Sequence, residues 1–389
     1  MRVRRTTASR AARVLAALAL AGALTACGDD GYTPSGPWKP LPEGAPPEVS
    51  PPTDSAPAPA PGQPAEPGSG QQASDPNVVA TDLDVPTGLV VLPDGTAIVG
   101  ERETGRLVQV FPDRSPAREL MTVPGIDNAG DGGLLGLALS PTYAEDGLIY
   151  AYVSTATDNR VVRFPIGGTP NPVLTGIPRG ETHNGGGLLF AEDGTLYVGT
   201  GDAGTPALAQ DPSSLAGKVL HVDVFGQPVN GVLVHAQGLA DVTSLCLGAN
   251  QTLFATDDSA TGADELDAIA FGRDYGWPTA APGSGDPVVT FPADQGGPGG
   301  CAVSGTTVFL GMRDGQKISI VALDQHGAVV DKPEEFLAGT YGRLRSVALD
   351  QQGGLWITTS NRDGLGTPKD GDDKVLRIIP PTSGGDSPL

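Results

Sequence analysis

One short pattern recurs along this chain and limits what it can fold into. Two apolar strands flank a tight turn built on Asp-Gly, as in residues 89–100 and 188–199. Asp-Gly and Gly-Gly suit hairpin turns that need a positive φ angle. Other copies, some with a different turn, occupy residues 137–152, 244–255, 307–323 and 347–357. Six units of roughly 50 residues predict an all-β, six-bladed propeller, with a pair of β-sandwiches as the weaker alternative.

Several units continue into a further, outer strand, at residues 160–164, 218–222 and 374–378. No stretch after the first 27 residues shows sustained helical periodicity, so the sequence offers no helical layer to cover a sheet. We expect the propeller to span residues 77–380 and residues 381–389 to form a disordered tail.

The first 27 residues have the composition of an export signal. Five arginines and no acidic residue stand before Cys27, and residues 14–26 form an apolar run. That run is too short to cross roughly 30 Å of hydrocarbon as a helix, and it fits a signal-peptide core. The four residues 24–27 resemble a bacterial lipobox, so we expect cleavage after residue 26 and lipidation of Cys27. An ordinary secretory signal that happens to end in cysteine is the alternative.

Residues 27–76 are expected to be a lipidated N-terminus followed by a spacer. Thirteen prolines fall within residues 34–67, mixed with small and polar residues. Proline removes backbone donors and favours extended backbone, so we expect this stretch to be extended or disordered. The predicted location is therefore the extracytoplasmic side of the cell membrane, reached through the lipid anchor.

Charge and cysteine content restrict the partners and the compartment. The formal charge of −21 becomes −26 once the five arginines of the signal are removed. Such acidity repels phosphate backbones and anionic headgroups, which argues against nucleic acid and leaves the lipid anchor as the membrane contact. Outside the cytoplasm thiols tend to oxidise, so Cys246 and Cys301 either pair or are small buried residues, and we favour the pair.

Polar residues beside the repeat strands are the candidates for chemistry, because propellers place sites on loops at the mouth of the central channel. His183 precedes a repeat strand among glycines that admit a ligand close to the backbone, and histidine suits a general base. Asp202 follows a strand of the same unit, where it could orient His183 or bind a cation. A turn histidine and an Asx turn are the structural alternatives.

Arg343 and Arg345 alternate along a predicted strand, so two guanidinium groups on one face would suit a polyanionic ligand. A pair of surface arginines is the alternative. The sequence contains no Walker loop, no G-x-S-x-G elbow and no H-E-x-x-H motif, which argues against NTPases, α/β-hydrolases and zinc proteases.

Taken in order, several motifs resemble those of the glucose/sorbosone dehydrogenase family, soluble aldose dehydrogenases that use pyrroloquinoline quinone (PQQ) on a six-bladed propeller. The matching segments lie at residues 132–136, 183–186, 201–202, 214–220, 264–267, 274–278, 342–345, 359–364 and 372–378. The resemblance covers about residues 83–379. It implies PQQ- and calcium-dependent oxidation of an aldose sugar at C1 to the lactone.

The resemblance also implies residue roles. His183 would be the catalytic base for the C1 hydroxyl, and Asp202 would support it. The implied cofactor-binding residues are Arg313, Arg343, Arg345 and Thr359. Calcium would bind PQQ and act as a Lewis acid, held by backbone carbonyls near Ser259 and Ala260.

The chain departs from the family's pattern at several positions. Ala240 and Asp241 stand where Arg and Asn usually contact PQQ, and Asp131 stands where a Gln often lies near the substrate. Gly187 replaces an arginine, and residues 257–260 replace the usual calcium segment. Losing one charge-assisted contact would cost about 1.5–3 kcal/mol of cofactor binding. These changes indicate an altered substrate, an altered cofactor or no catalysis.

Two further hypotheses therefore stand beside the dehydrogenase. One is a non-catalytic propeller lipoprotein that binds a glycan or a protein partner. The other is a calcium-dependent, lactonase-like hydrolase.

Overall fold

The computed structural model describes residues 75–381 apart from 249, 260–263 and 280–283. Cys27, nearly all of the predicted spacer and all but the first residue of the predicted tail lie outside the described residues. Within the described part of the chain, no helix is long and apolar enough to cross a bilayer.

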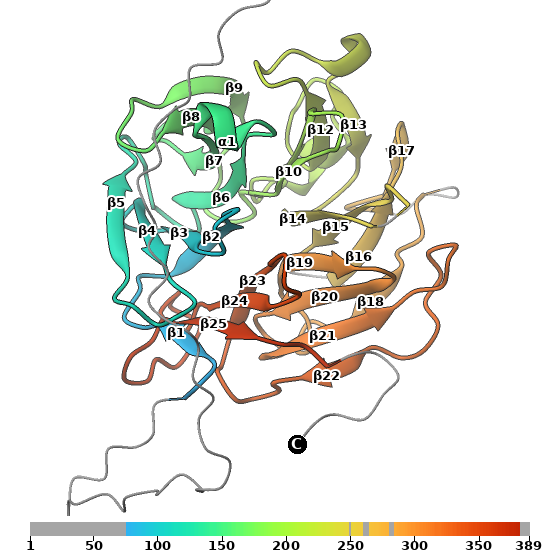
Figure 1. Ribbon diagram of the computed structural model, residues 1–389. Coiled ribbons are helices and arrows are strands. Elements are labelled where there is room, and N and C mark those ends of the chain that lie inside the picture. The colour runs from blue at the N-terminus through green and yellow to red at the C-terminus, as the bar shows by residue number, and fades with distance from the viewer. Residues whose placement is uncertain (1–74, 249, 260–263, 280–283, 382–389) are drawn as a thin grey trace, which may run out of the picture. The chain divides into compact units, whose positions relative to one another are not determined.

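Six sheets surround a central axis, one for each repeat unit, as the sequence predicted (Figure 1). Blade 1 comprises β2 (Pro86–Val91), β3 (Ala97–Glu101), β4 (Arg106–Val110) and β5 (Arg118–Thr122). Blade 2 comprises β6 (Leu134–Leu139), β7 (Leu148–Ser154), β8 (Asn159–Pro165) and β9 (Asn171–Ile177). Blade 3 comprises β10 (Leu188–Phe190), β11 (Leu196–Gly199), β12 (Lys218–Val222), β13 (Val234–Gln237) and the parallel β17 (Arg273–Asp274).

The other blades follow the same plan. Blade 4 comprises β14 (Val242–Leu247), β15 (Leu253–Asp257), β16 (Asp264–Ile269) and β18 (Val289–Phe291). Blade 5 comprises β19 (Pro298–Ser304), β20 (Thr307–Met312), β21 (Lys317–Ala322) and β22 (Glu334–Phe336). Blade 6 comprises β23 (Leu344–Leu349), β24 (Leu355–Thr359), β25 (Val375–Ile378) and β1 (Val78–Ala80). The short helices α1 (Tyr143–Asp146), η1 (Pro206–Gln210) and η2 (Val229–Gly231) lie in connections.

Both ends of the described chain build the last blade. β1 pairs antiparallel with β25, so the first strand becomes the outer strand of the sheet that contains the last three. Reciprocal backbone bonds between Leu83 and Asp373, each 3.1 Å, continue this pairing beyond the strands. The ring is therefore closed by hydrogen bonds between segments from opposite ends of the sequence.

The repeated pattern corresponds to the inner two strands in five of the blades. In blade 5 the unit at 307–323 is instead the middle pair, β20 and β21, and the innermost strand β19 was not predicted. β19 begins Pro298-Gly-Gly, which lacks the apolar run of the other innermost strands. The predicted further strands at 160–164, 218–222 and 374–378 are the third strands β8, β12 and β25 rather than blade edges.

Apolar side chains fill the spaces between neighbouring blades. One cluster packs Leu107 of β4 against Ile149 of β7, and both side chains are fully buried. Another packs Phe254 of β15 against Leu310 of β20 in the next blade. Burying a side chain of this size contributes about 1.5–3 kcal/mol, so blade-to-blade packing stabilises the ring as well as each sheet.

Alternation of strand direction brings distant loops to one face. Within a blade the strands are antiparallel, so the second and fourth strands end at the same side. Loops that follow second strands, and loops that lead from a fourth strand to the next blade's first strand, therefore gather at one mouth of the channel. Functional side chains on any blade can meet there.

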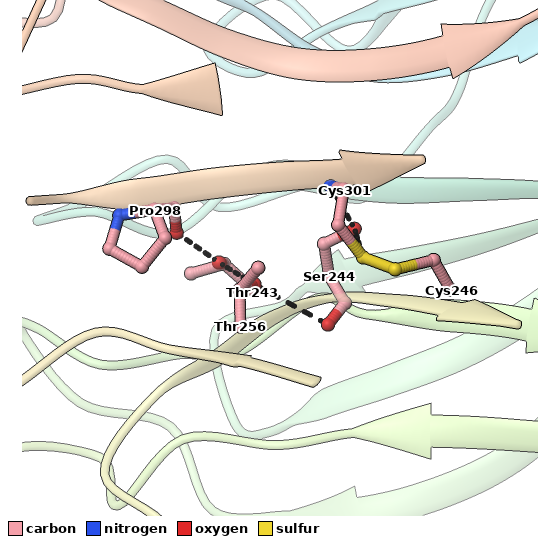
Figure 2. The surroundings of a disulfide bond; sticks show 6 residues. All are labelled: Thr243, Ser244, Cys246, Thr256, Pro298 and Cys301. Atoms are coloured by element: carbon pink, nitrogen blue, oxygen red, sulfur yellow. Dashed lines mark hydrogen bonds between the residues drawn. A yellow bond between two sulfur atoms is a disulfide. The ribbon is translucent and has the colours of Figure 1, made fainter. Parts of the chain in front are cut away.

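Cys246 and Cys301 form a disulfide that joins β14 of blade 4 to β19 of blade 5 (Figure 2). The backbone amide of Cys301 also donates to Ser244 Oγ at 3.2 Å, and Thr243 Oγ1 donates to the Pro298 carbonyl at 2.7 Å. The innermost strands of two neighbouring blades are thus joined covalently and by hydrogen bonds. The predicted pairing of these cysteines is confirmed.

We expect the double variant Cys246→Ser/Cys301→Ser to unfold at lower denaturant concentration. The disulfide closes a loop with a sequence separation of 55, and a loop of this length supplies up to about 4 kcal/mol by restricting the unfolded chain. Chemical denaturation of both proteins, each with and without reductant, measures the difference. Equal stability of the two oxidised proteins would contradict the expectation.

Candidate active site

A cavity of about 520 Å³ opens at the mouth where the second and fourth strands end. Its charged and polar lining comes from loops of every blade. The titratable residues that line it are Arg102, Asp131, Glu181, His183, Asp241, Asp258, Arg313, Arg345 and Asp363. Most of them stand within five residues of the end of a second strand or the start of a first strand, which is where the fold gathers its loops.

His183 lies in the connection between β9 and β10, and its Nδ1 is 2.9 Å from Oδ1 of Asp202. The turn holds His183 at a φ of 58°, in the left-handed region. Its backbone amide donates to Asp131 Oδ2 at 2.8 Å. Because Nδ1 faces Asp202, the other ring nitrogen, Nε2, is the one left for a ligand. The structure therefore brings together the two residues predicted to act as base and supporting carboxylate.

Asp202 is held from several sides and is completely buried. Its Oδ1 also accepts the Gly204 amide at 2.8 Å, and its Oδ2 accepts Nε1 of Trp277 at 2.8 Å. Trp277 is fixed in turn, because its backbone amide donates to the Gly238 carbonyl and its own carbonyl accepts Gln210 Nε2, each at 2.9 Å. The 274–278 motif thus orients the carboxylate that orients His183.

The surroundings of His183 favour its protonated form. The hydrogen bond to Asp202 raises the pKa of His183 to about 9, helped by the charges of Asp241 and Asp258 and opposed by burial. Burial in turn raises the pKa of the Asp241 carboxyl well above its usual range, as does the charge of Asp131. His183 is therefore surrounded by acidic groups, and burial favours the neutral form of one of them, Asp241.

Arginines form the basic part of the lining. Arg345 is buried, and its guanidinium has no hydrogen bond or ion pair with any described residue. Burial, together with repulsion by Arg313 and Arg102, lowers the pKa of Arg345 to about 9. Arg102 pairs with Glu103 at 2.9 Å, but its buried Nε has no partner. Arg313 is paired with Asp258. Buried donors without partners indicate a site for an anionic ligand.

Two of the predicted cofactor-binding residues do not line this cavity. Arg343 bonds Asp363 Oδ2 at 2.9 Å and also pairs with Asp314, and it lines a second cavity of about 390 Å³. The expected alternation with Arg345 fails because Arg343 precedes β23 and the strand register shifts between Leu344 and Val347.

Thr359 lies within β24, where it is completely buried. Its hydroxyl donates to Asp373 at 3.1 Å and accepts the Lys374 amide at 2.8 Å. Both of its hydrogen-bonding roles are thus taken up inside blade 6.

The predicted calcium position is only partly described. Ala260 lies outside the described residues. The amide of Ser259 donates to Asp264 Oδ1 at 2.9 Å, and its buried hydroxyl has no partner.

Among the described residues, one acidic cluster has carboxylate oxygens within 4.8 Å of one another: Asp257, Glu265 and Asp267. Asp267 is completely buried with neither carboxylate oxygen hydrogen-bonded, and burial raises the pKa of its carboxyl. Asp257 accepts the amides of Ala240 and Asp241, so the cluster lies behind the cavity wall.

A model of the family described as Glucose / Sorbosone dehydrogenase matches residues 83–296. The chain belongs to the glucose/sorbosone dehydrogenase family. The PQQ-bound structure of an aldose sugar dehydrogenase from Streptomyces coelicolor is 39% identical, with a TM-score of 0.74. That similarity covers 77% of this chain and 95% of the other.

Curated relatives of this dehydrogenase family are more distant in sequence. Quinoprotein glucose dehydrogenase B of Acinetobacter calcoaceticus is 27% identical over 252 residues, which is 53% of each chain. An aldose sugar dehydrogenase of Escherichia coli is 26% identical over 227 residues, which is 52% of this chain and 61% of the relative. The matches thus span little more than half the length of either relative.

Sequence reasoning missed Arg102, Asp258 and Asp363 as lining residues of this dehydrogenase-like cavity. Each stands one to four residues after a second strand, β3, β15 or β24. A rule that selects charged residues just beyond the second strand of each repeat would have found them.

We expect the substitution Asp202→Asn to lower the pKa of His183 from about 9 to its ordinary value or below. The largest raising interaction is lost, while burial still disfavours the imidazolium. A pH titration of the His183 imidazole signal by NMR measures this, with the exposed Glu192→Gln as a charge-matched control. A pKa that stays near 9 in Asp202→Asn would show that the pair does not control the imidazole.

Proposed function

We propose that this protein oxidises an aldose sugar at C1 to the lactone outside the cytoplasm, with PQQ and calcium. The observation that carries the proposal is the His183–Asp202 pair, with His183 lining a cavity that also contains Arg345, an arginine without an ion pair among the described residues. Membership of the family and the 39% identity to a PQQ-bound aldose sugar dehydrogenase support it.

The chain's own residues would hold and move one proton. Nε2 of His183 accepts the proton of the C1 hydroxyl as the C1 hydrogen leaves with its electron pair. Asp202 keeps the imidazole in the orientation that presents Nε2 and stabilises the imidazolium that results. When bound, PQQ supplies the oxidising power by accepting that hydride.

The arginines fit a flat polycarboxylate such as PQQ. Arg345 lines the cavity without an ion pair among the described residues, and Nε of Arg102 is a buried donor with no partner, so carboxylates would supply acceptors to both. Arg313 would stand at the quinone. Arg343 would act at a distance, by fixing Asp363 in the cavity wall.

Calcium fits the acidic cluster behind the wall. Carboxylate oxygens are the ligands that this cation prefers. A bound ion would supply the positive charge that the buried, unpartnered carboxylate oxygens of Asp267 lack. The backbone near Ser259 remains the proposed position for a calcium beside the cofactor.

The proposed location is the outer side of the cell membrane, on a lipid at Cys27. The sequence of the first 27 residues and the disulfide between Cys246 and Cys301 support it. We expect the full-length chain to incorporate labelled palmitate and Cys27→Ala to fail to do so. Equal labelling of both proteins would overturn the lipid anchor.

A non-catalytic glycan-binding or protein-binding propeller is the second candidate, favoured by the buried Asp241 in a wall that must face an anionic cofactor. The hydrolase hypothesis receives less support, because no member of the described acidic cluster lines the cavity.

We expect the purified domain to bind PQQ in calorimetric titration with calcium, and then to reduce a dye with an aldose. Arg345→Met should weaken PQQ binding by tenfold or more, because a charge-assisted contact is worth about 1.5–3 kcal/mol. His183→Gln should bind PQQ but lose turnover.

Since only neutral imidazole accepts a proton, kcat/KM should rise with pH towards the His183 pKa of about 9.

Two controls accompany this titration. Chelation of calcium should lower the melting temperature of the wild type more than that of Asp267→Asn, where the cluster has lost a ligand. No binding at high micromolar PQQ, in a protein that is folded by circular dichroism, would overturn the dehydrogenase proposal and favour the non-catalytic one.

A further inference from the structure

The cavity has more carboxylates than cations on the side where His183 lies. Asp131, Glu181 and Asp241 surround the turn that carries the imidazole. The Asp131 amide donates to the Glu181 carbonyl at 2.9 Å, which joins two of the three segments. Asp241 Oδ1 accepts the Gly185 amide at 2.7 Å, two residues beyond His183. The three carboxylates therefore belong to one continuous wall.

None of these three carboxylates forms an ion pair with an arginine or lysine of the described chain. Other acids nearby do: Asp258 pairs with Arg313, Asp363 with Arg343, and Asp127 with Arg179. The three lining carboxylates without an arginine or lysine partner in the described chain therefore all lie beside the imidazole. Arg345, the lining arginine without an ion pair, is the group left for an anionic cofactor.

Asp241 makes this wall more than an acidic surface. Its residue is only 6% exposed, and its Oδ2 has no hydrogen bond to a described residue although the side chain lines the cavity. Burying a carboxylate is costly unless it takes up a proton or meets a cation. A bound cation would satisfy the same carboxylate.

The reaction fixes where on a sugar such a cation would be. If His183 takes the proton from the C1 hydroxyl, the substituent on C2 is the nearest neighbour of the reacting centre. An ammonium group on C2 would therefore face the wall that Asp131 and Asp241 form, with Glu181 towards the rim. A neutral hydroxyl there could accept or donate hydrogen bonds but would leave the excess charge in place.

We infer that the substrate is a cationic sugar, a 2-amino-2-deoxyaldose, whose ammonium group is held by Asp131, Asp241 and Glu181 beside His183. This inference rests on the proposed oxidation at C1. The overall change is loss of the C1 hydroxyl proton to His183 and of the C1 hydride to the quinone cofactor, and the C2 ammonium keeps its bonds throughout.

The inference also accounts for a base that would otherwise be protonated. Asp241 and Asp258 help to raise the pKa of His183 to about 9. An ammonium group placed among these carboxylates offsets their charge and lowers the affinity of the imidazole for a proton. A cationic substrate would thus favour the neutral, proton-accepting form of His183 more than a neutral sugar would.

The test compares glucosamine, glucose and N-acetylglucosamine in dye reduction by the PQQ-loaded protein. We expect kcat/KM for glucosamine to exceed that for both neutral sugars by about tenfold or more, as one charge-assisted contact implies. Asp131→Asn and Glu181→Gln should each reduce the glucosamine-to-glucose ratio severalfold. Glu192→Gln, which removes an exposed carboxylate from the turn between β10 and β11, should leave the ratio unchanged.

A second readout separates the outcomes. The pH profile of kcat reports groups in the substrate complex, so its rising limb should lie at lower pH with glucosamine than with glucose. Calorimetric titration of the cofactor-free protein should show salt-sensitive binding of glucosamine and weaker binding of glucose. Turnover of glucose with no preference for glucosamine would overturn this inference and leave the proposed function standing. No turnover of any aldose despite bound PQQ would overturn the proposed function itself.

Discussion

The pairing of β1 with β25 is the constraint on which the rest of this molecule depends. Each blade is a small sheet that cannot bury its own faces, and its apolar side chains are covered only by the next blade around the ring. That arrangement is complete only when the last blade meets the first. The backbone bonds between Leu83 and Asp373 and the register of Val78 with Leu376 close it. The cavity needs this closure, because its lining comes from every blade.

The sequence predicts much of this fold because the constraint is periodic. Asp-Gly turns between apolar strands reveal the inner strands of blades 1, 2 and 3, and His183 and Asp202 stand at the ends of such strands. β19 is not predicted from the sequence, because its Pro-Gly-Gly start has no apolar run. Its position is set by pairing with β20 and by the disulfide at Cys301. Local patterns show strands, whereas blade edges are fixed by partners distant in sequence.

The site is less predictable from the sequence, because the direction of a side chain and the charges around it depend on how distant segments pack together. Arg343 and Arg345 are two residues apart, which predicted that both face the same ligand. A shift in strand register instead pairs Arg343 with Asp363 and leaves Arg345 in the cavity lining. Trp277 could not be linked to Asp202 by any local pattern, because the two are joined across the loops between blades. The raised pKa of His183 depends on Asp202, Asp241 and Asp258, which lie in three separate segments of the sequence.

Closure by the two chain ends also has a consequence for how the protein is made. A ribosome releases the chain from its N-terminus, so β1 emerges before the other strands and its partner β25 emerges after them. Contacts of such long range form slowly, since the intervening chain must be ordered first. Until residue 378 is free, β1 has no sheet to join and the mouth of the channel lacks part of its wall. A chain truncated by even its final strand would therefore lose the cavity as a whole, rather than one-sixth of it.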